Sequence, residues 1–565
     1  MRVSAGREYL PLLVIGLFLF LIKAYDPVRS PVLAALDPWG WVNLTREFLI
    51  THELDPFFTQ SGYPPTFMYV VAGIASLGAD PYDVVRYIPI VSVLNVIPIY
   101  LLTLDIFRSH RISALTSVLA TTSRLYFMRT SIGNPEGLSH FFFGFMFLFM
   151  LRALTTRKWT YEMLAAVFLA VTVLYYHFTL IILLPLLAAM LFTTGLQKRV
   201  TAKVLTTIVA PAALFSGIVW YFRFLPEIVH YYFGTRIYTY QIPAFEHSFI
   251  GYLYMLVHSV GKSAVVALAE LGYAMTLLAL VGVLGVFVWR RTGKGHTVGI
   301  NSLLTYLFVL VFLAIALRTV YNLGIAGAGD SGVYVFGWIA VPAAAFASNI
   351  VAVGSNRLVG VFVGARKAIS QKGVLKVVTV VLLVLLAVVN LSAVNYYKAS
   401  SGGGLGILQS HYYYKCLTDE EYYALEYVRD NTPNDAIVIV IGVEQPILAY
   451  QAMVAQRTIV SVSNATSVGG NPVLDVIVMF PSLRSTNLTI AEMKLNAEGQ
   501  QSIYLVTGIR KVNLEVARMD HSPPANTTLT EKLLMESIAD LTKYEQVYQN
   551  DQVAVLQIFA ACLYY

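Results

Sequence analysis

Two carboxylates in unusual surroundings are the residues best placed to do chemistry in this chain. Asp37 lies among aromatic residues in the segment 35–41 (ALDPWGW), shortly after the first apolar run. Glu136 lies in the segment 133–137 (GNPEG), close to the amide of Asn134. A carboxylate beside a membrane is costly unless a cation, a metal ion or a substrate proton compensates its charge. These oxygen atoms can bind a hard cation, or Asp37 can take a proton from an acceptor hydroxyl or amide.

Each carboxylate also has a structural explanation that needs no chemistry. Asp is a good helix cap and Pro is favoured at the first helical position, so Asp37-Pro38 can simply begin an interfacial helix. Glu136 is flanked by glycine and can be a solvated loop acid. Capping and catalysis do not exclude each other, so the sequence leaves both readings open.

Arginines in later polar loops offer bidentate hydrogen bonds to a phosphate leaving group. Arg236 lies in a long polar loop, residues 223–262, and Arg318 begins a short loop that also contains Asp330. The apolar segment 67–77 is too short to span a membrane and can seat a lipid tail. The pattern therefore favours a site that binds a lipid phosphate.

The composition places these residues in a membrane protein. Of 565 residues, 57% are hydrophobic and only 13% are charged, and the mean hydropathy is +0.66. Repeated apolar runs of about 16 to 25 residues are typical of membrane-spanning helices. The formal net charge of +7 does not indicate nucleic-acid binding, because the basic residues gather at helix ends rather than in an aromatic-interleaved patch.

Run lengths and charges together predict how the chain crosses the membrane. An uncleaved first span is expected at residues 9–22, because no convincing cleavage site follows it. Basic residues gather in alternate loops and acidic residues in the others, so the positive-inside rule predicts a cytoplasmic N-terminus and an external first loop, residues 26–83. We expect about 11 to 13 spans in all, the later ones near residues 84–107, 112–127, 138–151, 163–176, 178–196, 204–222, 264–288, 300–317, 333–353 and 377–394.

A second domain is predicted after the last span. The transmembrane module covers residues 1–398, and an extracytoplasmic α/β domain covers residues 399–565 after a flexible Ser-Gly junction. Cys416 and Cys562 lie near the two ends of this domain, where they can form a disulfide or remain separate thiols. Apolar patterning predicts helices at 418–430 and 530–541 and strands at 436–441, 458–462, 503–506 and 553–559.

The early motifs resemble those of the GT-C superfamily, the membrane glycosyltransferases that use polyprenyl-phosphate-linked sugars. Asp37-Pro38-Trp39 matches an Asp-Pro-aromatic motif, and Tyr63-Pro64-Pro65 matches a Tyr-Pro segment that leads into a short helix. Residues 129–137 (RTSIGNPEG) stand where the family has an Arg-Ser-like stretch and an Asp-x-Glu-Gly motif. Within the superfamily, the motifs are most similar to the catalytic subunit of archaeal and eukaryotic oligosaccharyltransferases.

The resemblance assigns roles to individual residues. It implies that Asp37 is catalytic. It also implies Mn²⁺ or Mg²⁺ as a cofactor, with Asp37, Glu136 and Asn134 as its ligands. The expected substrate-binding residues are Arg129, Arg236, Arg318 and Tyr63. Arg129 and Tyr63 lie in the segments that match the family, whereas Arg236 and Arg318 are candidates because they lie in later external loops.

Two departures from the family pattern narrow the expected function. Asn134 replaces the first acid of the second loop, which weakens a divalent-metal site, so the cofactor is expected to be Mn²⁺, Mg²⁺ or none. The Trp-Trp-Asp-Tyr-Gly motif that reads the acceptor sequon is absent, and residues 442–446 (GVEQP) stand in its expected place. Sequon-reading transfer is therefore disfavoured.

The expected function is that of an archaeal-type glycosyltransferase. It moves a sugar from a polyprenyl-phosphate-linked donor to a glycan, lipid or protein acceptor at the outer face of the cell membrane, with Asp37 as general base. Three alternatives stay open: a non-catalytic scaffold subunit with the same fold, oligosaccharyltransferase-type N-glycosylation, and a secondary transporter.

Overall fold

The computed structural model forms two compact units, each described here by itself. Unit 1 comprises Met1–Tyr25, Thr51–Lys398 and Leu405–Tyr412, and unit 2 comprises Asp26–Ile50, Ala399–Gly404 and Tyr413–Tyr565. The predicted division between residues 398 and 399 stays a prediction, because the contacts also group Asp26–Ile50 with the C-terminal part. The structure describes residues 9–33, 37–176, 179, 182–183, 186–187, 202–229, 257–261, 263–264, 273–289, 297–322, 338–352, 381, 419–434, 436–441, 454–468, 471–479, 485–488, 503–507, 544–549 and 554–558.

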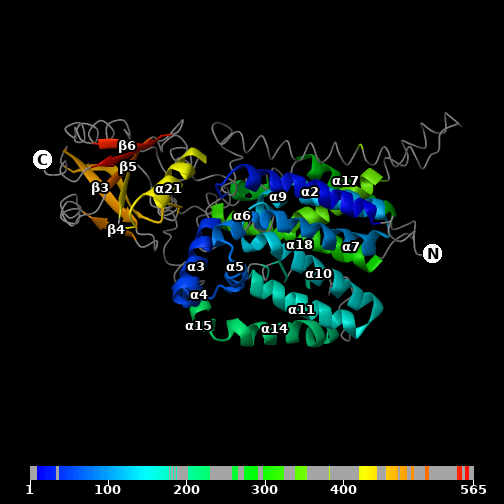
Figure 1. Cartoon of the computed structure of the whole chain (residues 1–565). Helices are drawn as coiled ribbons and strands as arrows, with labels where there is room; N and C mark the ends of the chain where they lie inside the picture. The colour runs from blue at the N-terminus through cyan, green and yellow to red at the C-terminus, as the bar shows by residue number, and fades with distance from the viewer. Residues whose placement is uncertain are drawn as a thin grey trace, which may run out of the picture. The chain divides into compact units, whose positions relative to one another are not determined.

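Unit 1 is helical throughout the part of the chain that the structure describes (Figure 1). Helix α10 packs against both α7 and α11. The helices are α2 (Leu10–Arg29, which continues into unit 2), α4 (Pro56–Ser61), α5 (Thr66–Ala75), α6 (Pro81–Val91), η1 (Ser92–Asn95), α7 (Val96–Phe107), α8 (His110–Thr122), α9 (Arg124–Thr130), α10 (Pro135–Thr156), α11 (Trp159–Tyr175), η2 (Leu205–Val209), α14 (Ala210–Ser216), η3 (Gly217–Tyr221), α15 (Leu225–Val229), α17 (Tyr273–Trp289), α18 (Thr297–Asn322) and the helix Trp338–Ala352.

The prediction of a polytopic helical membrane protein is confirmed. Among the described residues, five helices are long and apolar enough to cross a membrane: Leu10–Arg29, Pro81–Phe107, Pro135–Thr156, Ala202–Tyr221 and Gly299–Leu317. Several of their apolar side chains are exposed, including Leu17 and Ile218, which is expected for surfaces that face lipid. The spans predicted at 178–196 and 377–394 lie almost wholly outside the described residues.

The prediction of one span at residues 112–127 is wrong. The segment forms two helices, α8 and α9, because Ser123 between them has the extended backbone angles φ −60° and ψ 141°. Every residue of α8 from Ile112 to Thr122 is buried. Its serine and threonine hydroxyls bond back to the carbonyls of the preceding turn, as Thr121 does to Ser117 at 2.5 Å, which is typical of helices that bend or end.

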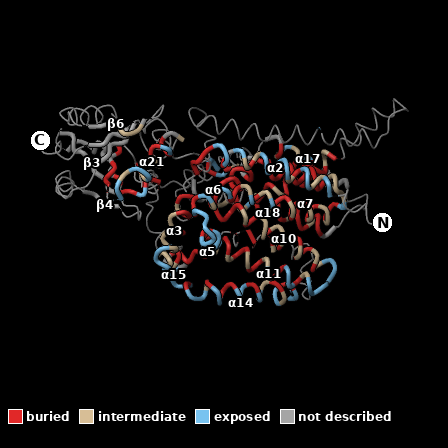
Figure 2. The backbone as a smooth tube through the Cα atoms, viewed as in Figure 1, coloured by how far each residue is buried: buried red, intermediate tan, exposed pale blue. Residues whose placement is uncertain are grey.

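The core of unit 1 lies between the inward faces of these helices (Figure 2). Ile106 of α7, Leu115 of α8 and Phe346 of the helix Trp338–Ala352 are all fully buried there. Helix α17 approaches the last of these closely, since a Cβ at Gly282 would lie 2.1 Å from the backbone oxygen of Phe346. Only glycine permits this approach.

Unit 2 contains α3 (Asp37–Thr51, whose last residue belongs to unit 1), α21 (Asp419–Asn431) and a seven-stranded sheet of order β4-β3-β2-β1-β5-β7-β6. Strand β1 is parallel to both of its neighbours, and the other pairs are antiparallel. The strands are β1 (Ile437–Ile441), β2 (Thr458–Val468), β3 (Asn471–Met479), β4 (Ser485–Leu488), β5 (Ile503–Thr507), β6 (Tyr544–Gln549) and β7 (Ala554–Ile558).

The predicted helix at 418–430 and the four predicted strands are confirmed as α21, β1, β2, β5 and β7. Strands β3, β4 and β6 were not expected. Two of them contain polar residues at close intervals, as in Ser485–Leu488 and Tyr544–Gln549, and they take strand form through antiparallel pairing with β3 and β7. The predicted helix at 530–541, Cys416 and Cys562 lie outside the described residues.

Arg457, just before β2, holds the C-terminal end of α21. Its side chain is 3% exposed, and Nη2 donates to the carbonyl oxygens of Arg429 at 2.7 Å and Thr432 at 2.6 Å. Nε donates to the Thr432 hydroxyl at 3.2 Å. The last carbonyls of a helix lack partners inside the helix, so a cationic side chain here both caps the end and complements the helix dipole.

We predict that Arg457→Ala loosens α21 in the intact protein. Hydrogen bonds to a charged group contribute about 1.5–3 kcal/mol, so amide hydrogen exchange in Asp419–Asn431 should accelerate by about tenfold or more. Arg429→Ala is the matched control, because Arg429 makes only partly exposed ion pairs with Glu426 and Asp430, which stabilise little. Equal exchange in the two variants would contradict the capping role.

Candidate functional site

The loop between α9 and α10 places Glu136 at the start of a long apolar helix. Asn134 is the N-cap of α10 and its Oδ1 accepts from the Gly137 N–H at 3.3 Å, while Pro135 fills the first helical position. Glu136 thus lies in the first turn, where the helix dipole favours an acid. The loop also packs tightly against α6, since a Cβ at Gly133 would lie 2.3 Å from the backbone oxygen of Val85.

A buried ion pair joins Glu136 to the preceding helix. The side chain of Glu136 is 0% exposed and that of Arg129 is 2% exposed. Arg129 Nε donates to Glu136 Oε2 at 2.6 Å, and Nη2 also contacts this oxygen. The expectation that Glu136 is a solvated loop acid is therefore wrong, because its charge is balanced inside the protein.

Lys23 of α2 binds the same region from a third direction. Its ammonium group donates to Thr130 Oγ1 at 2.6 Å, to the Thr130 carbonyl at 2.9 Å and to Ser92 Oγ at 2.7 Å. It also lies 5.3 Å from the centre of the Phe127 ring. These contacts tie α2 to η1 and to the residue that follows Arg129.

His140 and two aromatic rings lie one helical turn beyond Glu136. The His140 ring stacks on Trp338 with 3.9 Å between ring centres, and the Tyr126 ring lies 4.5 Å away. His140 Nε2 is 4.0 Å from Glu136 Oε1, beyond hydrogen-bond reach. Asn95 completes the cluster by donating from Nδ2 to the Gly137 carbonyl at 2.8 Å.

Among the described side chains of this cluster, basic groups outnumber acidic ones. Lys23 and Arg129 each carry a formal positive charge, Glu136 carries one negative charge, and the bonding partners of Lys23 named above are neutral oxygens. In low-dielectric surroundings such charges act over longer distances than in water. The local field therefore favours an anion over a cation.

The structure brings only some of the predicted site residues together. Arg129, Asn134 and Glu136 lie in one buried cluster. Tyr63 is also buried in unit 1, where its ring lies 5.7 Å from that of Phe57 and its N–H donates to Ser61 Oγ. Its role in substrate binding stays a prediction.

The remaining predicted residues are described less fully. Asp37 is the first residue of α3, so the expectation that Asp37-Pro38 begins a helix is confirmed. Its side chain lies outside the described part of the structure, as does that of Arg318 within α18. Arg236 lies entirely outside the described residues. The catalytic role of Asp37 and the binding roles of both arginines stay predictions.

The two second-loop residues predicted as metal ligands have protein partners in the geometry described. Asn134 Oδ1 accepts the capping hydrogen bond, and Glu136 Oε2 accepts from Arg129. A metal ion prefers oxygen atoms that are not already held by a cationic donor. Ligation by Asp37, Glu136 and Asn134 therefore stays a prediction without support from this cluster.

Lys23 was not expected from the sequence to be part of the cluster. In the sequence, Lys23 directly follows the first apolar run, so the first span was predicted to end at residue 22. Helix α2 instead continues to Arg29, so Lys23 lies inside the helix. A cation within an apolar helix needs partners, and that rule would have identified it.

Part of the helical unit that contains this cluster is similar to a known protein family. Residues 63–221 match the family model described as dolichyl-phosphate-mannose-protein mannosyltransferase. The match includes Tyr63 and the whole Arg129–Glu136 loop. The resemblance to the GT-C membrane glycosyltransferases is confirmed. The matching model is not that of an oligosaccharyltransferase, and none of the curated proteins matches the chain.

Two solved structures match this chain over nearly its whole length. The crystal structure of ArnT from Cupriavidus metallidurans bound to undecaprenyl phosphate is 12% identical, with a TM-score of 0.48 and 99% of each chain covered. The structure of the same protein in the apo state is 11% identical, with a TM-score of 0.46 and the same coverage. Likenesses at this level do not establish a shared site or activity.

We predict that the Arg129–Glu136 pair is strongly coupled. Either Arg129→Met or Glu136→Gln alone leaves a buried group without its partner and should lower the free energy of unfolding by about 3–5 kcal/mol. The double variant should be more stable than the sum of the two losses implies. Chemical denaturation of the detergent-solubilised protein measures this cycle.

The pair Arg152–Asp105 is the matched control, because it is more exposed, at 30% and 19% of the two side chains. Its variants should lose about 1 kcal/mol or less. Strictly additive losses for Arg129→Met and Glu136→Gln would refute the coupling.

Proposed function

We propose that this protein transfers a sugar from a polyprenyl-phosphate-linked donor to a hydroxyl on a glycan, lipid or protein acceptor, at the outer face of the cell membrane. The observation that carries the proposal is the family match over residues 63–221, which includes the buried Arg129–Glu136 loop. The motif at Asp37-Pro38-Trp39 supports it from outside the matched segment. The proposed orientation has the N-terminus in the cytoplasm and the C-terminal α/β domain outside, following the distribution of basic residues.

In the proposed reaction, Asp37 acts as general base. It takes the proton from the acceptor hydroxyl while the hydroxyl oxygen attacks the anomeric carbon of the donor sugar. The bond from that carbon to the phosphate oxygen breaks, and the polyprenyl phosphate leaves with the bonding electrons. The balance of atoms is complete with donor and acceptor alone.

The leaving phosphate gains negative charge in this reaction, so cationic groups nearby would stabilise the transition state. Arg236 and Arg318 are the candidates for direct contact. Arg129 is bound to Glu136, so we assign it a different part: together with Lys23 it gives the region a positive field that favours an anionic donor. Tyr63 is proposed to contact the donor.

We propose that the reaction needs no divalent metal. Asn134 and Glu136 already have protein partners, and a monophosphate leaving group carries less charge to stabilise than a pyrophosphate. Lys and Arg side chains supply that stabilisation without a metal.

The metal-free proposal predicts that sugar transfer continues when divalent ions are chelated. Transfer from a purified lipid monophosphate-sugar should change less than twofold when EDTA is added to protein prepared without divalent ions. Loss of activity with EDTA and its recovery with Mn²⁺ would show that the metal-free proposal is wrong.

The catalytic proposal predicts a large loss for Asp37→Asn. With the protein in liposomes and a panel of polyprenyl-phosphate-linked sugars, mass spectrometry of the products should show transfer reduced by about 10²–10⁴-fold, the contribution of a general base. Glu53→Gln is the matched control, because Glu53 is an exposed acid of the same predicted loop, and it should keep wild-type transfer. Transfer that is unchanged in Asp37→Asn would refute the role of Asp37, and absence of transfer from every donor would favour the scaffold alternative.

A further inference from the structure

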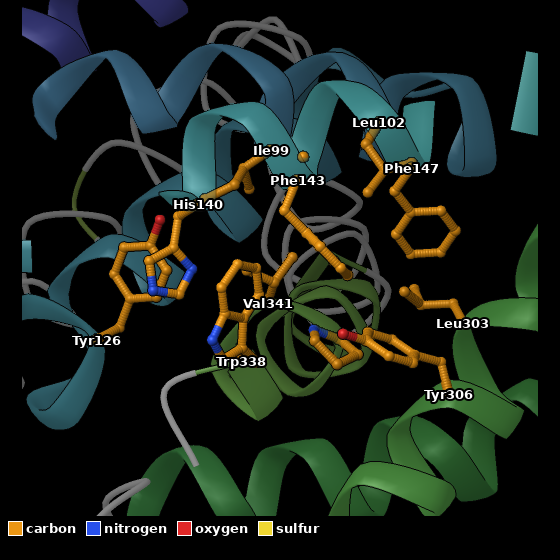
Figure 3. A pocket seen from close by; sticks show the side chains of 12 residues that line it. Ile99, Leu102, Tyr126, His140, Phe143, Phe147, Leu303, Tyr306, Trp338 and Val341 are labelled. Atoms are coloured by element: carbon orange, nitrogen blue, oxygen red, sulfur yellow. The ribbon is translucent and has the colours of Figure 1, made fainter. Parts of the chain in front are cut away.

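A small cavity lies inside unit 1, inward of Glu136 along α10. Its volume is ≈ 30 Å³. Five elements contribute to its walls, among the described residues (Figure 3): α7 through Ile99 and Leu102, α9 through Tyr126, α10 through His140, Phe143 and Phe147, α18 through Leu303 and Tyr306, and the helix Trp338–Ala352 through Trp338. The lining is mainly aromatic and aliphatic.

Polar atoms without hydrogen-bond partners are concentrated in this lining. His140 Nε2, Tyr306 Oη and Trp338 Nε1 are all buried and have no partner within the described part of the protein. The three side chains are 4%, 2% and 3% exposed. Figure 3 shows Tyr306 reaching from α18 toward the helix that carries Trp338 and Val341.

Such a concentration is costly if the cavity is dry. An unsatisfied buried donor or acceptor lowers stability, and most buried polar groups in proteins have a partner in the protein or in ordered water. Three unsatisfied polar groups around one dry cavity would be unusual in a protein core. The cavity itself therefore offers the explanation, because it lies beside all three residues.

The size of the cavity selects the ligand. A bound water molecule needs a cavity volume of about 10–15 Å³, and it also needs two to four polar partners. The volume of ≈ 30 Å³ holds about two water molecules and no sugar, phosphate or lipid tail. A cation is disfavoured because the polar groups named here include two N–H or O–H donors and no carboxylate.

We propose that this cavity is an internal hydration site. One or two water molecules bind there and hydrogen-bond to His140 Nε2, the Tyr306 hydroxyl and the Trp338 indole N–H. The water links α10, α18 and the helix Trp338–Ala352. The hydration site lies one helical turn inward of the Arg129–Glu136 pair. The proposal of this site does not depend on the proposed transfer reaction.

Removal of a single oxygen atom tests the site. In Tyr306→Phe the aromatic ring remains and only the hydroxyl is lost. If water binds the hydroxyl, the variant should unfold at a lower temperature, because a satisfied hydrogen bond is deleted. If the cavity is dry, deletion of an unsatisfied hydroxyl should leave the unfolding temperature unchanged or raise it, and that result would overturn the proposal.

Tyr175→Phe is the matched control. Tyr175 is 2% exposed and its hydroxyl also has no partner among the described residues, but it is not part of this cavity lining. Its loss should leave the unfolding temperature unchanged or raise it, which calibrates the assay for an unsatisfied hydroxyl.

Direct observation gives an independent readout on the full-length protein. A high-resolution structure should contain density within hydrogen-bond distance of at least two of His140 Nε2, Tyr306 Oη and Trp338 Nε1. Crystals under xenon pressure should show no xenon there, because dry apolar cavities bind xenon and hydrated ones do not. Xenon in the cavity would overturn the proposal.

Discussion

The ion pair between Arg129 and Glu136 constrains much of what surrounds it in unit 1. A carboxylate that is fully buried within an apolar bundle must be paired, because an isolated charge there costs far more than the fold can offset. The pair requires the C-terminal end of α9 and the first turn of α10 to meet at a fixed separation. The connecting loop must then be short and closely packed, and Gly133 satisfies that need against α6.

Other helices contact the ends of α9 and α10 that carry this ion pair. Lys23 fixes α2 to the same loop through Thr130 and Ser92, and Asn95 holds the first turn of α10. His140 continues the polar stripe inward and stacks on Trp338. Polar side chains therefore follow one another from the loop into the bundle, and His140 and Trp338 border the internal cavity.

The sequence predicted the parts of this arrangement that depend on local signals. Apolar run lengths identified several of the membrane helices, and the Asp37-Pro38 pair indicated a helix start. Strands β1, β5 and β7 followed from short apolar runs between turn residues. The motifs around Asp37 and Glu136 also indicated the resemblance to the GT-C superfamily.

The sequence did not predict the features that depend on tertiary contacts. Glu136 looked solvated because nothing in its neighbourhood shows that Arg129, seven residues earlier, folds back to it. The break at Ser123 was missed because a hydrophobic average does not register backbone competition by hydroxyls. Lys23 and Trp338 are far from the loop in sequence, so only the packing of helices brings them to it.

The central claim is that this protein adds a sugar to an acceptor by using Asp37. The most direct test is mass spectrometry of the glycolipids and surface glycoproteins of the source organism, with and without the gene. We expect that deletion removes one sugar from a defined class of molecules, and that wild-type protein restores it whereas an equally abundant Asp37→Asn variant does not. Unchanged glycans on deletion, or full restoration by Asp37→Asn, would contradict it.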